Sequence, residues 1–402
     1  MKKNALRIAA FALAMLMVAG LITACVREVE APLGNDAPIT EVTIGMISPL
    51  TGPVSQFGTA VERGVRLYVD QFNALGGLQI NIIPHDDEGN PAIAAIGFDR
   101  LLDNNVTAII GAVTSGPTRA IVPLAYEANM PMITATATHF NVTVSEAGHV
   151  FTNMFRSCFI DPFQGQRMAE FSAEILEART AAVLYSNEID YSIGLMEAFV
   201  ARAEELGVEI VAVQRFADGA LDFRSQLTLI AQHSPDVLFV PAYYRHIGLI
   251  GPQSVEVGLP GTTLVGADGW ATITDFMTDS SSIEGAYFLT GFSAEADSLL
   301  VQSFVADYRE RHDGNTPNMF AAQAFDAAKI LIAAIERTIE NTDYNPASDQ
   351  FRTALIANMA ATDLTGVTGR ITFDELNNPE KTAIILQVQN GKEVFWGYYP
   401  MD

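Results

Sequence analysis

Two kinds of side chain in this 402-residue sequence are placed where they could bind the two ends of a zwitterion. Hydroxyl groups cluster in segments 111–118 and 134–138, each directly after a short apolar run typical of a β-strand. A lone acid, Asp268, follows another such run. Hydroxyls and the free N–H groups at a helix start can bind an anion. A carboxylate can hold an ammonium through a charge-assisted hydrogen bond.

The candidate anion donors are four hydroxyl groups, those of Thr114, Ser115, Thr136 and Thr138. They suit a carboxylate, particularly beside the N-terminus of the helix expected to follow. An alternative is that Ser115 and Thr118 only cap that helix. The local pattern does not decide between the two, because helix capping and anion binding use the same orphan N–H groups.

Asp268 is the lone acid of the segment Gly266-Ala267-Asp268-Gly269-Trp270. One interpretation is an ammonium site, in which Tyr243 and Trp270 flank the acid and stack on a cation or an apolar side chain. The alternative is an Asx turn before Gly269, a common use of aspartate in that position.

The elements that must position these residues follow a βαβ rhythm. Strands are expected at 42–47, 78–84 and 106–111 with amphipathic helices between them, and the rhythm restarts after Asp161. The near-continuous apolar run 236–240 is typical of a strand covered on both faces. We therefore predict an α/β fold with two doubly wound parallel-sheet lobes. In such sheets ligands bind beyond the carboxyl ends of the strands.

The C-terminal third breaks this rhythm. Helices are expected at 303–312 and 317–339, and strands at 370–373, 382–388 and 393–398. The last two strands are joined at Asn-Gly, a hairpin signal. The chain therefore has enough material to cross between the lobes more than once.

The first 40 residues predict export and anchoring. A basic start is followed by the apolar run 8–22 and by Ala24-Cys25, which together describe a secretory signal at 1–24 that resembles a bacterial lipobox. An uncleaved anchor is the alternative, but the run is shorter than a membrane span of roughly 20 residues. Cys25 would carry the lipid, and residues 25–40 would form a tether. The expected location is extracytoplasmic, on a membrane-anchored lipoprotein.

Composition argues against several classes of function. The formal net charge of −24 disfavours nucleic acid and anionic lipid as partners. If Cys25 is lipidated, Cys158 has no partner for a disulfide, and we expect a small buried thiol. The six histidines lack metal-site spacing, and no dinucleotide loop, Walker loop or nucleophile elbow is present. We expect no metal, no cofactor and no catalysis.

Several short motifs then carry a family likeness. They lie in a fixed order along the chain, at 48–53, 72–77, 86–91, 155–165, 236–240 and 366–374. With them the sequence resembles, over about 41–401, the leucine/isoleucine/valine-binding family of ABC-transporter substrate-binding proteins. The resemblance implies the type I periplasmic-binding fold.

The resemblance also implies a role for individual residues at the carboxylate end of an amino-acid ligand. Ser115 and Thr138 match the hydroxyls that hold the ligand carboxylate. Thr136 and Ala137 stand beside them and contribute backbone groups.

At the other end of the ligand, Tyr243 and Asp268 match the groups that hold the α-ammonium. Tyr191 matches an aromatic residue of the second lobe that closes over the ligand. Phe57 and Phe320 match side-chain pocket walls.

Three hinge crossings are implied as well. The expected lobes are 41–160 with 293–367, and 161–292 with 368–402. The implied protein is a monomer that captures an amino acid, branched-chain-like, by clamshell closure and serves an ABC permease and ATPase. The alternatives are a ligand sensor for a chemosensory or kinase receptor, and a short amide or carboxylate as ligand.

Overall fold

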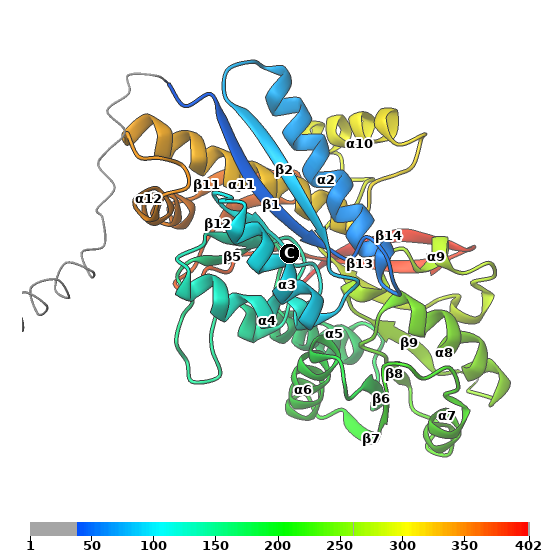
Figure 1. The fold of residues 1–402 in the computed structure, drawn as a ribbon. Helices are drawn as coiled ribbons and strands as arrows, with labels where there is room; N and C mark the ends of the chain where they lie inside the picture. Colours follow the sequence, from blue (N-terminus) through cyan, green and yellow to red (C-terminus); the bar gives the residue numbers. More distant parts are fainter. Residues whose placement is uncertain (1–37, 260, 401–402) are drawn as a thin grey trace, which may run out of the picture.

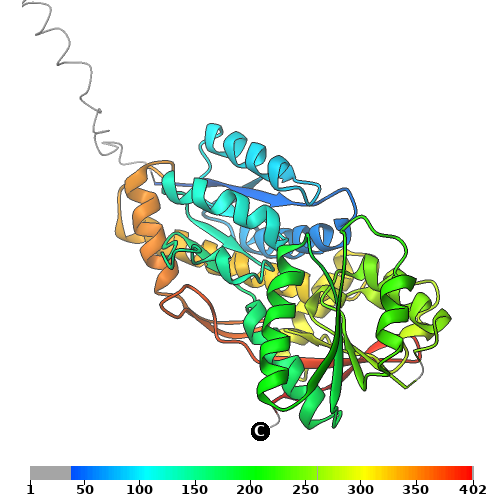
Figure 2. The ribbon, with the colours of Figure 1, turned by 90° about the horizontal axis from the view of Figure 1, so that it is seen from below.

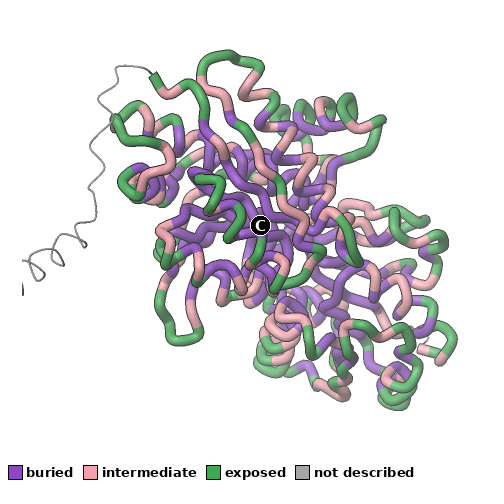
Figure 3. Tube along the Cα trace, viewed as in Figure 1, coloured by how far each residue is buried: buried purple, intermediate pink, exposed green. Residues whose placement is uncertain are grey.

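The computed structural model describes residues 38–259 and 261–400, and the predicted signal peptide, Cys25 and most of the tether lie outside them. Two α/β bodies stand side by side (Figures 1 and 2). We call the body built on the five-stranded sheet the first lobe and the one built on the seven-stranded sheet the second lobe. Buried backbone runs through both sheets and through the region where the lobes meet (Figure 3).

The first-lobe sheet is wholly parallel, with strand order β2-β1-β3-β4-β5. Its strands are β1 (Glu41–Ser48), β2 (Gln79–Asp86), β3 (Ile109–Ile110), β4 (Met132–Thr134) and β5 (Met154–Arg156). The helices of this lobe are α2 (Ser55–Ala74), α3 (Pro91–Asp103), α4 (Ser115–Glu127), α10 (Leu299–Arg311), α11 (Met319–Asn341) and α12 (Asp349–Ala360).

The second-lobe sheet has the order β14-β13-β10-β9-β8-β6-β7. The strands are β6 (Thr180–Ser186), β7 (Glu209–Phe216), β8 (Val237–Phe239), β9 (Thr263–Gly266), β10 (Tyr287–Thr290), β13 (Ala383–Gln389) and β14 (Lys392–Tyr399). The helices are α5 (Asp161–Glu174), α6 (Asp190–Glu205), α7 (Arg224–Ala231), α8 (Tyr244–Glu256) and α9 (Ile273–Phe276), with the 3₁₀ turn η3 (Asp268–Trp270).

Strand β13 runs antiparallel to both of its neighbours, β10 and β14, so the second sheet is mixed rather than purely parallel. The predicted Asn-Gly hairpin is confirmed. Asn390 and Gly391 both have positive φ, 51° and 73°, which the primed two-residue turns require.

The sequence pattern predicts a helix from Thr118 to Asn129, and α4 begins three residues earlier, at Ser115. Pro117 falls in its first turn, where a missing N–H costs no helical hydrogen bond. The segment Gly116-Pro117 therefore belongs to the helix instead of breaking it, which brings the helix N-terminus to the hydroxyl cluster.

The region between α12 and β13 lies against the first lobe. Strands β11 (Asp363–Gly366) and β12 (Gly369–Thr372) form a separate antiparallel pair. Asn377 Nδ2 then donates to the carbonyl of Met154 at 3.1 Å. These contacts favour a third hinge crossing near 379–382, later than the predicted boundary at 367.

A buried acid fastens this region to helix α11. The Asp326 carboxylate accepts hydrogen bonds from the backbone N–H of Val367 (2.8 Å) and of Thr368 (2.8 Å), and from the Thr368 hydroxyl (2.6 Å). Lys381 Nζ donates to the same hydroxyl at 2.6 Å. Burial raises the pKa of Asp326, and the Lys381 charge opposes that shift.

Within the described residues, no helix has the length and apolar character needed to cross a bilayer.

Candidate functional site

The strand ends of the two lobes meet at a small cavity of about 10 Å³, room for about one water molecule. All the predicted ligand residues except Ala137 and Thr138 line it. From the first lobe come Phe57, Val113, Thr114, Ser115, Thr136 and Phe320, and from the second lobe Tyr191, Tyr243, Asp268 and Gly269.

Ser115 is oriented as a donor toward this cavity. Its Oγ accepts the backbone N–H of His139 at 3.2 Å, so its own proton remains available. The backbone N–H groups of Ser115 and Gly116 have no acceptor within the described part of the chain. A hydroxyl and two free N–H groups at the start of a 13-residue helix form a site for an anion. Ser115 does not cap the helix through its side chain.

Thr136 presents a hydrogen-bond acceptor to the cavity, where Ser115 presents a donor. Its hydroxyl donates to the carbonyl of Val113 at 2.7 Å, which leaves only lone pairs for a ligand. An acceptor of this kind suits an ammonium rather than a carboxylate. The Thr134 hydroxyl fixes the loop by accepting the N–H of Thr136 (3.3 Å) and of Ala137 (3.1 Å).

Ala137 and Thr138 form a layer behind the cavity. The Ala137 carbonyl accepts from the buried guanidinium of Arg156 at 3.0 Å. The Thr138 carbonyl accepts the backbone N–H of Asp161 at 2.9 Å, and the buried Thr138 hydroxyl has no hydrogen-bond partner among the described residues. Their predicted contact with a ligand stays a prediction.

Asp268 is the acid of the cavity and is almost wholly buried. Its Oδ1 accepts the Tyr191 hydroxyl at 2.8 Å, and that hydroxyl in turn accepts the backbone N–H of Gly269 at 2.8 Å. Burial raises the pKa of Asp268 to about 6, against the opposing hydrogen bonds of Tyr191 and Gln164. The Asx-turn alternative does not describe this geometry, because the carboxylate bonds to a side chain 77 residues away.

Asp161 is a second buried acid that the sequence-based site did not include. It is the first residue of α5, is fully buried, and has its pKa raised by burial. The negative charge of Asp268 raises the pKa of Asp161 further. In the sequence, Asp161-Pro162 at the start of a helix could have pointed to this acid. The pair belongs to the motif at 155–165, which supports the family likeness but carried no predicted role for Asp161.

Aromatic rings connect the two lobes across the cavity. Phe57 stacks on Phe320 with ring centroids 4.2 Å apart, and meets Tyr243 edge-on at 5.5 Å. Tyr243 then stacks on Tyr191 at 5.0 Å. These rings fill most of the space in which an apolar side chain of a ligand would lie.

Polar contacts also bridge the cleft. Arg119 Nη1 of α4 and Asp190 Oδ2 of α6 form an ion pair at 2.7 Å. The Tyr244 hydroxyl of the second lobe donates to the Pro53 carbonyl of the first at 3.1 Å. The lobes are therefore in a closed arrangement.

Loss of the Arg119–Asp190 pair is expected to loosen this closed state. Asp190→Asn should weaken ligand binding by roughly fivefold at most, because the pair is partly exposed. The effect should fall at high salt. Stopped-flow release kinetics at low and high salt would measure it. Glu146→Gln is the control, since Glu146 also pairs with Arg119 but lies in the same lobe. Equal effects of both variants would contradict a latch between lobes.

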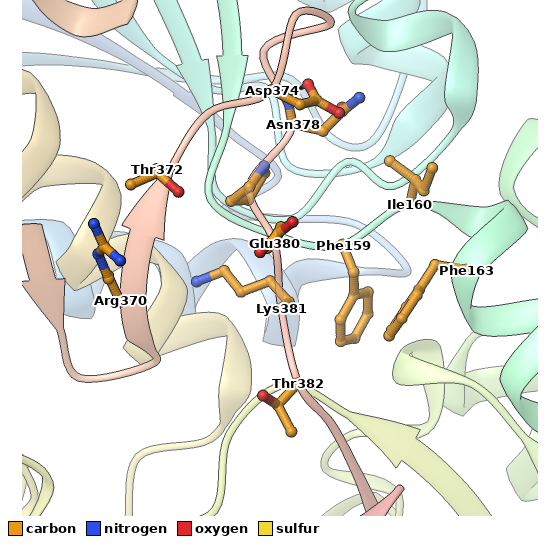
Figure 4. Close-up of a pocket in the computed structure, with 11 residues that line it drawn as sticks. Phe159, Ile160, Phe163, Arg370, Thr372, Asp374, Asn378, Glu380, Lys381 and Thr382 are labelled. Carbon is orange, nitrogen blue, oxygen red and sulfur yellow. Dashed lines mark hydrogen bonds between the residues drawn. The ribbon is translucent and has the colours of Figure 1, made fainter. Parts of the chain in front are cut away.

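A separate groove of about 570 Å³ lies at the hinge between 159–163 and 370–382 (Figure 4). Lys381 points away from the rings of Phe159 and Phe163, toward the side on which Arg370 lies (Figure 4). The two cationic side chains that line this groove already have partners. Arg370 pairs with Asp363 at 2.8 Å, and Lys381 donates a hydrogen bond to Thr368. None of the predicted ligand residues lines it, so we place the ligand site in the cleft.

Two doubly wound lobes, with free hydrogen-bond donors on one wall of the cleft and a buried acid on the other, are the architecture of a ligand-capture protein. The sequence matches the family model described as "Periplasmic binding protein" over residues 41–393. A Leu/Ile/Val-binding protein BraC3 of Rhizobium johnstonii is 27% identical over 319 residues, 76% of this chain and 81% of that protein.

Solved structures of branched-chain amino acid binding proteins are also similar to this chain. The leucine-binding protein LivK of Thermotoga maritima has a TM-score of 0.80 and 31% identity, covering 89% of this chain and 98% of that one. The substrate-binding protein LivJ of Streptococcus pneumoniae, solved with isoleucine, has a TM-score of 0.78 and 28% identity, covering 89% and 99%. The chain belongs to the periplasmic binding protein family, in its branched-chain amino acid binding group, whose members bind ligands and are not enzymes.

Proposed function

We propose that this protein captures an α-amino acid, branched-chain-like in its apolar part, and delivers it to the permease and ATPase of an ABC importer. The observation that carries the proposal is the pairing of Ser115, a donor on the first lobe, with Asp268, a buried carboxylate on the second. Within the described residues Asp268 has no ion-pair partner. A buried carboxylate without a cation is costly, and an ammonium offsets that cost.

The two anchors act in sequence. In an open state, Ser115 and the start of α4 hold the ligand carboxylate on the first lobe. Tyr191, Tyr243 and Asp268 then reach the ammonium as the second lobe closes. Because these contacts exist only in the closed state, binding shifts the hinge equilibrium toward closure.

The names of the relatives support an amino acid as the ligand, since they include leucine-binding and Leu/Ile/Val-binding proteins. The lipid anchor at Cys25 and a monomeric state are also part of the proposal. Cys25→Ser should move the protein from the membrane fraction to the soluble fraction of cells. An unchanged distribution would remove the anchor from the proposal.

The test compares leucine with two analogues by calorimetry. Isocaproate lacks the ammonium and leucine amide lacks the carboxylate, so each should bind at least about tenfold more weakly than leucine. A thermal-shift screen of all twenty amino acids would show which side chain stabilises the protein most. If isocaproate binds as tightly as leucine, no ammonium site exists.

Affinity should also depend on pH through Asp268. Its pKa is raised to about 6, so acidification protonates it and removes the charge that attracts an ammonium. Binding should therefore be strongest above about pH 6 and weaken below it, by up to about tenfold per pH unit. Calorimetry between pH 5 and 8 would measure this dependence, and Asp268→Asn should flatten it. A wild-type affinity that is constant over this range would contradict the assignment.

A further inference from the structure

A second cavity opens between the lobes directly outside the first. It has a volume of about 220 Å³ and shares Thr114 and Tyr243 with the small cavity. We call the small cavity the inner chamber and this one the outer chamber. The outer chamber is lined by residues 53–54, 88–89, 91, 114 and 116–117 of the first lobe and by 188–190, 218, 243 and 245 of the second.

The two shared residues have hydroxyls that point to a ligand. Thr114 is 7% exposed and Tyr243 is 8% exposed. Neither side-chain hydroxyl has a hydrogen-bond partner among residues 38–259 and 261–400. Both side chains line the two cavities, so their hydroxyls are free to hydrogen-bond a ligand there. A ligand that passes from the inner to the outer chamber would run between these two groups.

The charges of the outer chamber indicate what the far end of such a ligand carries. Its lining holds four carboxylates and one guanidinium, those of Glu88, Glu188, Asp190, Asp218 and Arg245. Arg245 already pairs with Asp218, and Asp190 already pairs with Arg119. Glu88 and Glu188 have no cation partner within the described residues. The chamber therefore favours a cation.

We infer that the preferred ligand is an α-amino acid with a long side chain that ends in a cation, held with its head by the residues that line the inner chamber and its charged end in the outer chamber. The inference rests on the proposed function. The apolar stem of such a side chain can pack on the rings of Phe57 and Phe320 as a branched side chain would, while the charged end stays in a wet, acidic space.

The test uses ligands that share a stem. Norleucine and lysine have the same four-carbon stem, and only lysine carries a terminal ammonium. By calorimetry with the purified protein, lysine should bind at least about fivefold more tightly than norleucine. The double variant Glu88→Gln with Glu188→Gln should abolish that preference and leave norleucine affinity unchanged. Glu146→Gln is the matched control, because Glu146 is an exposed acid outside both chambers.

The outcomes separate the two claims. If no α-amino acid binds, the proposed function fails. If leucine and norleucine bind but lysine binds no more tightly, the inference fails and the proposed function stands. A lysine preference that survives in the double variant also overturns the inference, because the outer chamber would then not be its cause.

Discussion

Asp268→Asn should reduce amino-acid affinity more than any other single change in the cleft. The asparagine keeps the shape and can still accept the Tyr191 hydroxyl, but it removes the negative charge that meets the ammonium. Loss of one partner of a buried charge pair costs about 2–5 kcal/mol. The dissociation constant for leucine, measured by calorimetry at pH 7.5, should therefore rise at least about 30-fold.

A stability measurement separates lost binding from lost folding. The ligand-free variant should unfold in urea at the same concentration as the wild type or at a higher one, because a buried carboxylate without a cation destabilises the folded protein. Asp161→Asn provides a parallel test of the second acid and should also weaken binding, by less than Asp268→Asn. An unchanged leucine affinity in Asp268→Asn would remove this residue from the site.

Asp326→Asn is expected to destabilise the protein by about 3 kcal/mol. The side chain is fully buried, and its two oxygens accept three hydrogen bonds from Val367 and Thr368. The amide supplies one acceptor where the carboxylate supplied two, and its NH₂ faces donors. Lys381 would also lose the negative charge that favours its ionised form. The shift of the urea midpoint would measure the change.

Asp363→Asn is the control for this variant. Asp363 lies on the neighbouring strand β11 and pairs with Arg370, but both groups are exposed, so little change in stability is expected. If the two variants unfold at the same urea concentration, Asp326 does not fasten the third crossing to α11.

The two-lobed α/β fold was predictable because helices and strands alternate with clear periodicity. The elements that the pattern missed have specific reasons. Strand β5 has only three residues, and β11 is Asp-Leu-Thr-Gly, which lacks an apolar run. Helix α12 has its apolar residues spread around its circumference, so no face stands out in the sequence.

Most of the candidate site was predictable from strand ends and the family likeness, because parallel strands bring their following loops to one edge. Other features depend on distances that a sequence does not contain. The ion pair Arg119–Asp190 joins residues 71 positions apart in the chain. The acceptor role of Thr136 depends on the Val113 carbonyl, and the outer chamber exists only where the two lobes face each other.

Cys158 is the one free thiol of the described residues, and burial raises its pKa to about 12. Such a thiol is almost wholly protonated near neutral pH and is closed to reagents. In a soluble form that begins after residue 37, cysteines introduced in pairs on the two rims of the cleft should therefore be the ones that take up maleimide dyes. Single-molecule fluorescence transfer could then follow opening and closing without removal of the native cysteine.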